Sequence, residues 1–304
     1  MNKQHYGYLC LILATLFWGG NYIFGKMLSR EVDPIVLTYL RWFPAAVILL
    51  LLFAKRTLTF YPTIQKTWKI LTALSLLGIV IFPLFLYQGL QTTTALNASI
   101  YLAVVPIAVL LLNRLVFGDK IRPLMLAGAV VSFFGVLCLL SQGDPQTLLQ
   151  FNVNKGDLWA IGSALSWALY CCIIRLRPTD LPNAVMLTLL VAIAMLCFTP
   201  VFLWKALTAS EPIISQISTS HWAMIGYLVI GPSILSYAFW NYGISLVGGA
   251  KGAVFTNVTP LFAALLGISV LGEALYWYHF ASGALIVLGL LMCNRKDNAI
   301  NKCG

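Results

Sequence analysis

A stretch of 26 residues occurs twice in this chain, and this duplication limits the possible folds more than any other feature of the sequence. Residues 95–120 align without a gap with residues 249–274, at an offset of 154. Each copy begins with small residues, passes a central proline (Pro106 or Pro260) into a long apolar run, and ends at a glycine followed by an acid. We therefore predict two related halves.

The similarity between the halves continues outside this stretch. Trp68 pairs with Trp222 at the same offset, and Trp18 pairs with Trp167 at an offset of 149. The predicted organisation is a first repeat (residues 1–140), an extracytoplasmic linker (141–155), a second repeat (156–294) and a cytoplasmic tail (295–304).

The composition predicts a membrane protein. Hydrophobic residues make up 60% of the chain and charged residues 9%, whereas soluble domains carry about 25% charge. The net charge of +10 is explained by membrane topology, so no nucleic-acid partner is expected. The seven cysteines form no CxxC motif, and we expect free, buried thiols, with no metal and no cofactor.

Apolar runs near the length of a bilayer-spanning helix divide the chain. A helix needs about 20 apolar residues to span, and it satisfies its own backbone polar groups in lipid. The fold class predicted is an all-α integral membrane protein of ten transmembrane helices. The expected spans are 6–28, 34–54, 67–88, 93–113, 121–140, 157–175, 183–204, 222–242, 248–271 and 275–293.

Positive charges predict the orientation of these spans. If both termini are cytoplasmic, 14 of the 19 Lys and Arg residues lie on the cytoplasmic side and four lie outside, as the positive-inside rule requires. Each half has five helices, an odd number, so the second half must enter the membrane from the opposite side. This 5+5 inverted-topology repeat is typical of carriers that expose a central site alternately to each side.

Several motifs resemble a known family. They are LFWGGNYIFGK at residues 16–26, the P-x6-R spacing from Pro34 to Arg41, and the two P-x11-G-[DE] segments that begin at Pro106 and Pro260. Together with the ten-span duplication, they resemble the EamA-type members of the drug/metabolite transporter superfamily. The resemblance covers nearly the whole chain, and it implies a secondary carrier in the cell inner membrane, often an exporter of amino acids or other small metabolites.

Polar and aromatic residues at helical spacing predict the substrate cavity, because polar groups are costly toward lipid and should face the bundle interior. Tyr87, Tyr170 and Trp240 could instead be interfacial anchors, and Lys251 could extend from its helix end to the cytoplasm. The residues expected to line the cavity are Trp18, Asn21, Tyr87, Asn97, Tyr101, Trp167, Tyr170, Tyr237, Trp240, Asn241, Lys251 and Phe255.

A second set is expected to serve structure or gating: Arg41, Pro106, Pro260, Asp119 and Glu273. The prolines should bend or locally open their helices. Arg41 lies about two turns into its span. Its alternatives are a cap on backbone carbonyls, an ion pair with Glu31 or Asp33, or a functional role.

The function predicted is export or exchange of a small organic metabolite through an aromatic and polar cavity. All nine acids lie at or beyond span ends, which argues against cationic substrates, so neutral or aromatic amino acids come first. A nucleoside or base carrier and a lipid flippase are the alternatives. The spans contain no HExxH, GxSxG or convergent acid pair, so we do not expect an enzyme. The expected partners are a small-molecule substrate and membrane lipids, and a homodimer is compatible with this organisation.

Overall fold

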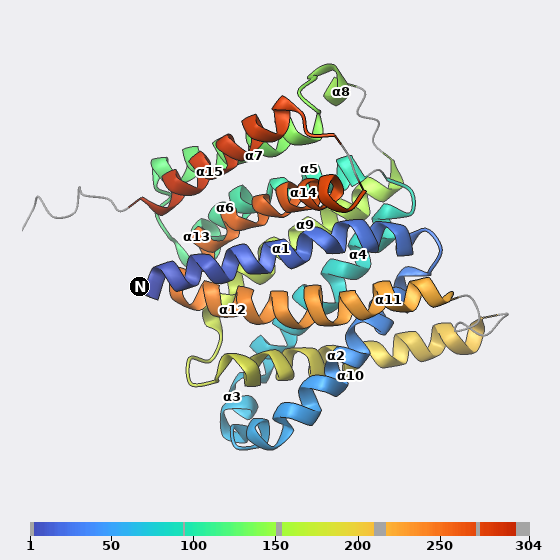
Figure 1. Cartoon of the computed structure of the whole chain (residues 1–304). Coiled ribbons are helices and arrows are strands. Elements are labelled where there is room, and N and C mark those ends of the chain that lie inside the picture. The colour runs from blue at the N-terminus through green and yellow to red at the C-terminus, as the bar shows by residue number, and fades with distance from the viewer. Residues whose placement is uncertain (1–2, 94, 150–153, 210–216, 272–273, 296–304) are drawn as a thin grey trace, which may run out of the picture.

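Figure 1 shows the computed structural model of the chain, a bundle of long helices lying side by side. The structure describes residues 3–93, 95–149, 154–209, 217–271 and 274–295. Helix α1 (Lys3–Ser29) begins, and helix α15 (Trp277–Asn294) ends, at the left of the picture. We call this end of the bundle the terminal side and the opposite end the far side.

The helices follow one another without a strand in the described residues. In the first half α1 is followed by α2 (Pro34–Leu58), α3 (Tyr61–Ser75), η1 (Leu76–Ile81), α4 (Phe82–Leu90), α5 (Ala95–Ala103), α6 (Val105–Phe117), α7 (Pro123–Leu140) and the short α8 (Gln146–Leu149). In the second half, before α15, are α9 (Lys155–Ile173), η2 (Ile174–Leu176), α10 (Asn183–Thr208), α11 (Thr219–Leu228), η4 (Val229–Leu235), α12 (Ser236–Val247), α13 (Gly249–Ala253), η5 (Val254–Val258) and α14 (Thr259–Leu271).

The predicted all-α membrane fold is confirmed. Within the described residues, nine helical segments are long and apolar enough to cross a membrane, and α6 is a shorter apolar helix. Some of these segments are composite, since α3, η1 and α4 run on as one rod, and α11, η4 and α12 form another. Together with the α5–α6 segment, the segments make ten.

Two predicted spans are not the continuous helices that the hydropathy suggested. The span predicted at 93–113 is divided at Val104 into α5 and α6, and α6 extends to Phe117. The span predicted at 248–271 consists of α13, the 3-10 segment η5 and α14. The break precedes a proline in each case, Pro106 or Pro260, because proline lacks the N–H for the preceding turn and its ring clashes with that turn. Hydropathy does not register such breaks.

The third helix of each half contains a π-helical segment at the same place. Residues 76–81 (η1) correspond to 230–235 at the offset of 154, and η4 covers 229–235. Pro83 follows η1 and Pro232 lies within η4, so each segment misses a main-chain donor. Carbonyl groups are thereby left open to side-chain donors.

Helix packing follows the repeat. The helix pairs with the most extensive contacts are α7 with α15, α1 with α12, α2 with α10, and α4 with α9. Since α1 corresponds to α9 and α4 to α12, two of these pairs are equivalents of each other, while α7–α15 and α2–α10 each join a helix to its own equivalent. The α7–α15 backbones meet closely at glycines, where a Cβ on Gly289 would lie 2.5 Å from the carbonyl oxygen of Gly128.

Candidate functional site

Five aromatic rings pack together at the centre of the bundle. Trp18 of α1 and Trp167 of α9 meet edge to face, with ring centroids 5.1 Å apart. Tyr237 and Trp240 of α12 lie 5.6 and 5.1 Å from Trp18, and Tyr170 stacks on Trp167 at 4.9 Å. All five are buried. We call these residues the aromatic cluster; edge-to-face and offset contacts are the favoured geometries for such rings.

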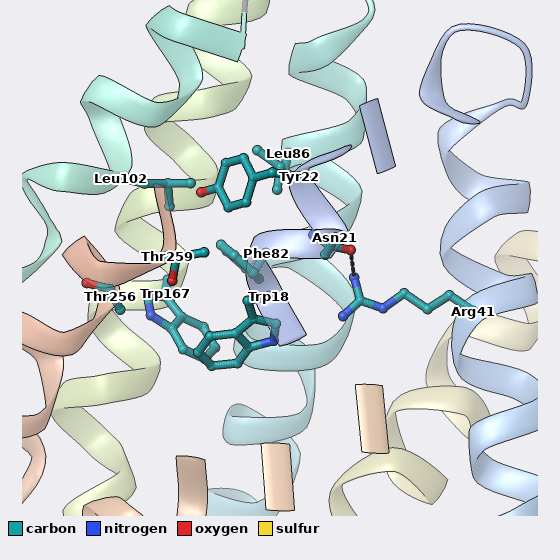
Figure 2. Close-up of a pocket in the computed structure, with 10 residues that line it drawn as sticks. All are labelled: Trp18, Asn21, Tyr22, Arg41, Phe82, Leu86, Leu102, Trp167, Thr256 and Thr259. Atoms are coloured by element: carbon teal, nitrogen blue, oxygen red, sulfur yellow. Dashed lines mark hydrogen bonds between the residues drawn. The ribbon is translucent and has the colours of Figure 1, made fainter. Parts of the chain in front are cut away.

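A small cavity of about 40 Å³ lies beside the aromatic cluster (Figure 2). Pockets that hold small molecules usually measure about 300–1,000 Å³, so the site is contracted in this structure. The residues that line the cavity come from both halves: Trp18, Asn21, Tyr22, Arg41, Phe82, Leu86, Leu102, Trp167, Thr256 and Thr259.

The π-helical segments supply carbonyl groups to the aromatic cluster. The indole Nε1 of Trp18 donates to the Pro232 carbonyl oxygen at 3.1 Å. In the other half, the Tyr237 hydroxyl donates to the carbonyl oxygen of Gly78, which lies at the position equivalent to Pro232. In a π-helix the carbonyl of Gly78 would accept from the N–H of residue 83. Residue 83 is a proline and has no N–H, so this carbonyl is free to accept from the Tyr237 hydroxyl. The irregular backbone is thus satisfied by the side chains of the site.

Two Tyr–Asn hydrogen bonds lie on opposite sides of the aromatic cluster. Toward the far side, the Tyr87 hydroxyl donates to Asn21 Oδ1 at 2.9 Å, and we call this the far-side pair. Toward the terminal side, the Tyr170 hydroxyl donates to Asn241 Oδ1 at 2.6 Å, which we call the terminal-side pair. The offsets of 149 and 154 make Asn21 equivalent to Tyr170 and Tyr87 equivalent to Asn241. The same two positions are therefore joined in each half, with the residue types exchanged.

Arg41 of α2 joins the far-side pair. Its guanidinium donates from Nε to Ser233 Oγ at 2.7 Å, from Nη1 to Asn21 Oδ1 at 3.0 Å and to the Tyr87 hydroxyl at 2.9 Å, and from Nη2 to the Pro232 carbonyl at 3.3 Å. Figure 2 shows it reaching from α2 to Asn21 at the cavity edge.

The ion pair considered for Arg41 is not present, because both candidate acids bind elsewhere. Glu31 pairs with His221 at 3.0 Å and Asp33 with Lys205 at 2.8 Å.

A second arginine contacts the terminal-side pair. Arg177 donates to the backbone oxygen of Asn241 at 2.8 Å. Burial lowers the pKa of the Arg177 guanidinium, but an arginine stays charged at neutral pH.

A wider vestibule of about 580 Å³ lies toward the far side. Tyr22 lines both this vestibule and the central cavity, so the two are adjacent. The other residues that line the vestibule are Ile23, Lys26, Met27, Arg30, Ser99, Leu139, Leu140, Gln142, Pro260, Ala263, Ala264, Tyr278 and His279.

A separate hollow of about 320 Å³ lies at the terminal side, near the ends of α9 and α12. Lys251 lines this hollow and is not among the residues that line the central cavity. Asp119 lies there too, in an exposed ion pair with Arg175 at 2.7 Å. Cys171 and Cys172, which are buried, complete its wall.

The other residues predicted for the site have varied positions. Tyr87, Tyr170 and Trp240 are completely buried, so they are not interfacial anchors. Phe255 stacks on Tyr8 at 5.8 Å, and Tyr101 is partly exposed; neither lines the central cavity. The Asn97 side chain and Glu273 lie outside what the structure describes. Pro106 and Pro260 are the second residues of α6 and α14, just after the breaks described above.

Sequence reasoning missed part of the cavity lining, namely Phe82, Leu86, Leu102, Thr256 and Thr259. One signal was available, because Leu102 and Thr256 are repeat equivalents at the offset of 154. Equivalent positions of the two halves meet at the centre, as Trp18 and Trp167 also do. Among the described residues, no cluster of His, Cys, Asp or Glu is arranged to hold a metal ion.

The chain is similar to known proteins along most of its length. The model of the EamA-like transporter family matches residues 5–141 and 154–295. The "Uncharacterized transporter YyaM" of Bacillus subtilis is 24% identical over 93% of this chain and 92% of its own. An "Uncharacterized transporter" of Archaeoglobus fulgidus is 28% identical over 98% of this chain and 99% of its own.

A relative from Escherichia coli K12, the "Uncharacterized inner membrane transporter YedA", is 27% identical over 93% of this chain and 88% of its own. A solved crystal structure of a protein superposes with a TM-score of 0.71 at 21% identity, covering 94% of this chain and 96% of the other. That similarity shows the fold. The names of the three relatives indicate a transporter and no substrate.

Proposed function

Because the chain belongs to the EamA-like transporter family, we propose that it is a secondary transporter that exports or exchanges neutral or aromatic amino acids by alternating access. The observation that carries the proposal is the contact between Trp18 and Trp167 beside the central cavity. These residues are repeat equivalents, so the two halves contribute corresponding side chains to one central site, as alternating access between inverted repeats requires.

The chemistry of the cavity supports this substrate class. Trp18, Trp167 and Phe82 provide aromatic walls, and the hydroxyls of Thr256 and Thr259 provide neutral polar groups. An aromatic or apolar side chain can stack on such walls while its polar end forms hydrogen bonds.

The closed Tyr–Asn pairs support an alternating mechanism. Both pairs are formed while the cavity measures only about 40 Å³, well below the roughly 300–1,000 Å³ of pockets that hold small molecules. A substrate can enter only if the cavity expands. In one state of the proposed cycle the far-side pair is open and the terminal-side pair is closed. In the other state the terminal-side pair is open and the far-side pair is closed.

Counterflow in proteoliposomes tests the proposal. Vesicles are preloaded in turn with amino acids, nucleosides and organic anions, and uptake of the labelled compound is measured. We expect saturable exchange of a neutral amino acid that Trp18→Ala abolishes. Trp68→Ala is the matched control, because Trp68 is 55% exposed at the bundle surface, and it should retain exchange. Accelerated movement of a labelled lipid without exchange of any soluble compound would favour the flippase instead.

We also propose that the terminal side faces the cytoplasm at the inner membrane. That side carries Lys55 and Arg56 in the last turn of α2, Arg122 just before α7 and Arg175 just after α9, in keeping with the positive-inside rule. Alkaline phosphatase fused after residue 304 should be inactive and green fluorescent protein at the same point fluorescent. The opposite result would reverse the orientation.

A further inference from the structure

Among the described residues that line the central cavity, Arg41 is the charged one. Its side chain is 2% exposed. It is the eighth residue of α2, so its Cα lies about 10 Å along the helix from the far-side end. A guanidinium at this depth is expensive unless its charge is compensated.

The protein does not supply a negative charge for Arg41 within the described residues. Its hydrogen-bond acceptors are Ser233, Asn21, Tyr87 and the Pro232 carbonyl, all of them neutral. Neutral dipoles soften the desolvation penalty of a buried cation, but they leave its charge in place. The site therefore contains one positive charge that an anion could neutralise.

The guanidinium also keeps hydrogen-bonding capacity. It has five N–H groups, and its hydrogen bonds to described residues use four of them, leaving one on Nη2. A carboxylate prefers a guanidinium partner because two N–H groups can meet its two oxygen atoms. An arriving carboxylate would use the remaining N–H and replace a neutral acceptor with a charged one.

The vestibule favours the approach of an anion. Lys26, Arg30 and His279 line it, and no acid is among the described residues that do so. A concave surface lined by charge of one sign concentrates counter-ions of the other sign. Tyr22 borders both spaces, so a compound in the vestibule is next to the cavity that Arg41 lines.

We propose that Arg41 binds the carboxylate of the substrate, and that the chain selects small monocarboxylates whether or not they carry an amino group. This proposal rests on the proposed function and narrows its substrate class. A single guanidinium matches a single carboxylate, whereas a phosphate monoester brings about two negative charges. The described lining contains no acid for an ammonium group, and Thr256 and Thr259 offer it only hydroxyls. The carboxylate is therefore the required group and the amino group is dispensable.

Three ligands of similar shape test the carboxylate and the amino group separately. They are phenylalanine, phenylalanine amide, which lacks the carboxylate, and 3-phenylpropionate, which lacks the amino group. Each competes against labelled phenylalanine in proteoliposome exchange. We expect phenylalanine and 3-phenylpropionate to compete similarly, and the amide to be weaker by about 10-fold to 100-fold, the size of a charge-assisted hydrogen bond. Arg41→Gln should weaken both acids by that factor and leave the amide unchanged. Arg56→Gln, at an exposed position in the last turn of the same helix, should change neither.

The failures of the two proposals can be distinguished. If phenylalanine exchanges but the amide competes as well as the acid, the role of Arg41 is overturned and the transporter proposal stands. If no amino acid exchanges, ligand-induced shifts in the melting temperature of the purified protein still compare 3-phenylpropionate with 3-phenylpropanamide. A shift for the acid alone supports the carboxylate site, and equal shifts or none overturn it. Because the ligand series uses the unmodified protein, the test holds even if Arg41→Gln does not fold.

Discussion

Removing the hydroxyl of Tyr170 should open the terminal side of the protein more often. Tyr170→Phe keeps the ring that stacks on Trp167 and deletes only the donor to Asn241 Oδ1. Both members of the terminal-side pair are completely buried. The substitution therefore weakens one hydrogen bond across the closed terminal side and leaves the packing in place.

The magnitude follows from hydrogen bonds measured between transmembrane helices, which average about 0.6 kcal/mol and reach about 1.7 kcal/mol. At about 1.36 kcal/mol for each factor of ten, this raises the ratio of terminal-side-open to closed molecules by about 3-fold to 18-fold. The upper part of this range is favoured, because the Nδ2 of Asn241 has no hydrogen-bond partner within the described residues. Among the described residues, no hydrogen bond from Nδ2 therefore holds the Asn241 side chain once the bond to Tyr170 is lost.

Native thiols can report this opening. Cys171 and Cys172 line the terminal-side hollow and are at most 1% exposed. With the other five cysteines replaced by alanine, the rate of labelling by a membrane-impermeant maleimide in vesicles of known orientation should rise with the open population. We expect Tyr170→Phe to raise this rate by about 3-fold to 18-fold.

Two variants serve as controls. Tyr242→Phe, at a position of α12 that is 47% exposed, should leave the labelling rate unchanged. Tyr87→Phe weakens the far-side pair, so it should not accelerate labelling from the terminal side. If Tyr170→Phe labels at the parental rate, or if Tyr87→Phe accelerates labelling equally, the terminal-side pair does not control access and the reasoning is wrong.

Three further substitutions test the packing and the polar contacts. Gly289→Ala should destabilise the protein by about 1–3 kcal/mol through overpacking of α7 against α15, whereas Gly283→Ala, where the nearest atom is 3.9 Å from the added Cβ, should be tolerated; thermal unfolding in detergent compares them. Trp18→Phe should lower stability in the same assay by at least about 1 kcal/mol, because the Trp18 indole donates to the Pro232 carbonyl and phenylalanine cannot. Asp119→Asn should change stability by less than about 1 kcal/mol, because its ion pair is exposed.

The architecture was predictable because it depends on two properties that can be read directly from the sequence. Hydropathy gives the spans, and the repeat at an offset of 154 gives the two halves. The breaks at Val104 and in η5 were only partly predictable. Pro106 and Pro260 indicated that their helices would be disturbed, but hydropathy treats a proline in an apolar run as part of the run. Where each helix breaks depends on local hydrogen bonds that hydropathy does not describe.

The centre of the site was less predictable, because it depends on pairings across the sequence. Trp18 and Trp167 could be singled out as repeat equivalents, but their edge-to-face contact requires the tertiary fold. The surroundings of Arg41 could not be derived either. Its partner Ser233 is 192 residues away, and the nearby Glu31 and Asp33 were the obvious candidates until the structure showed that each binds another residue.

The seam between α7 and α15 has a further consequence for motion. These helices are equivalents of each other, so an exchange of conformation between the two halves maps the seam onto itself. The α1–α12 and α4–α9 contacts, by contrast, are mapped onto one another and must trade their geometries. The distance between two residues that are each other's equivalents across this seam, such as Ser132 of α7 and Ile286 of α15 at the offset of 154, should therefore be equal at both ends of the transport cycle. A distance probe placed across this seam is then an internal standard, and a change in its reading reports loss of the fold rather than turnover.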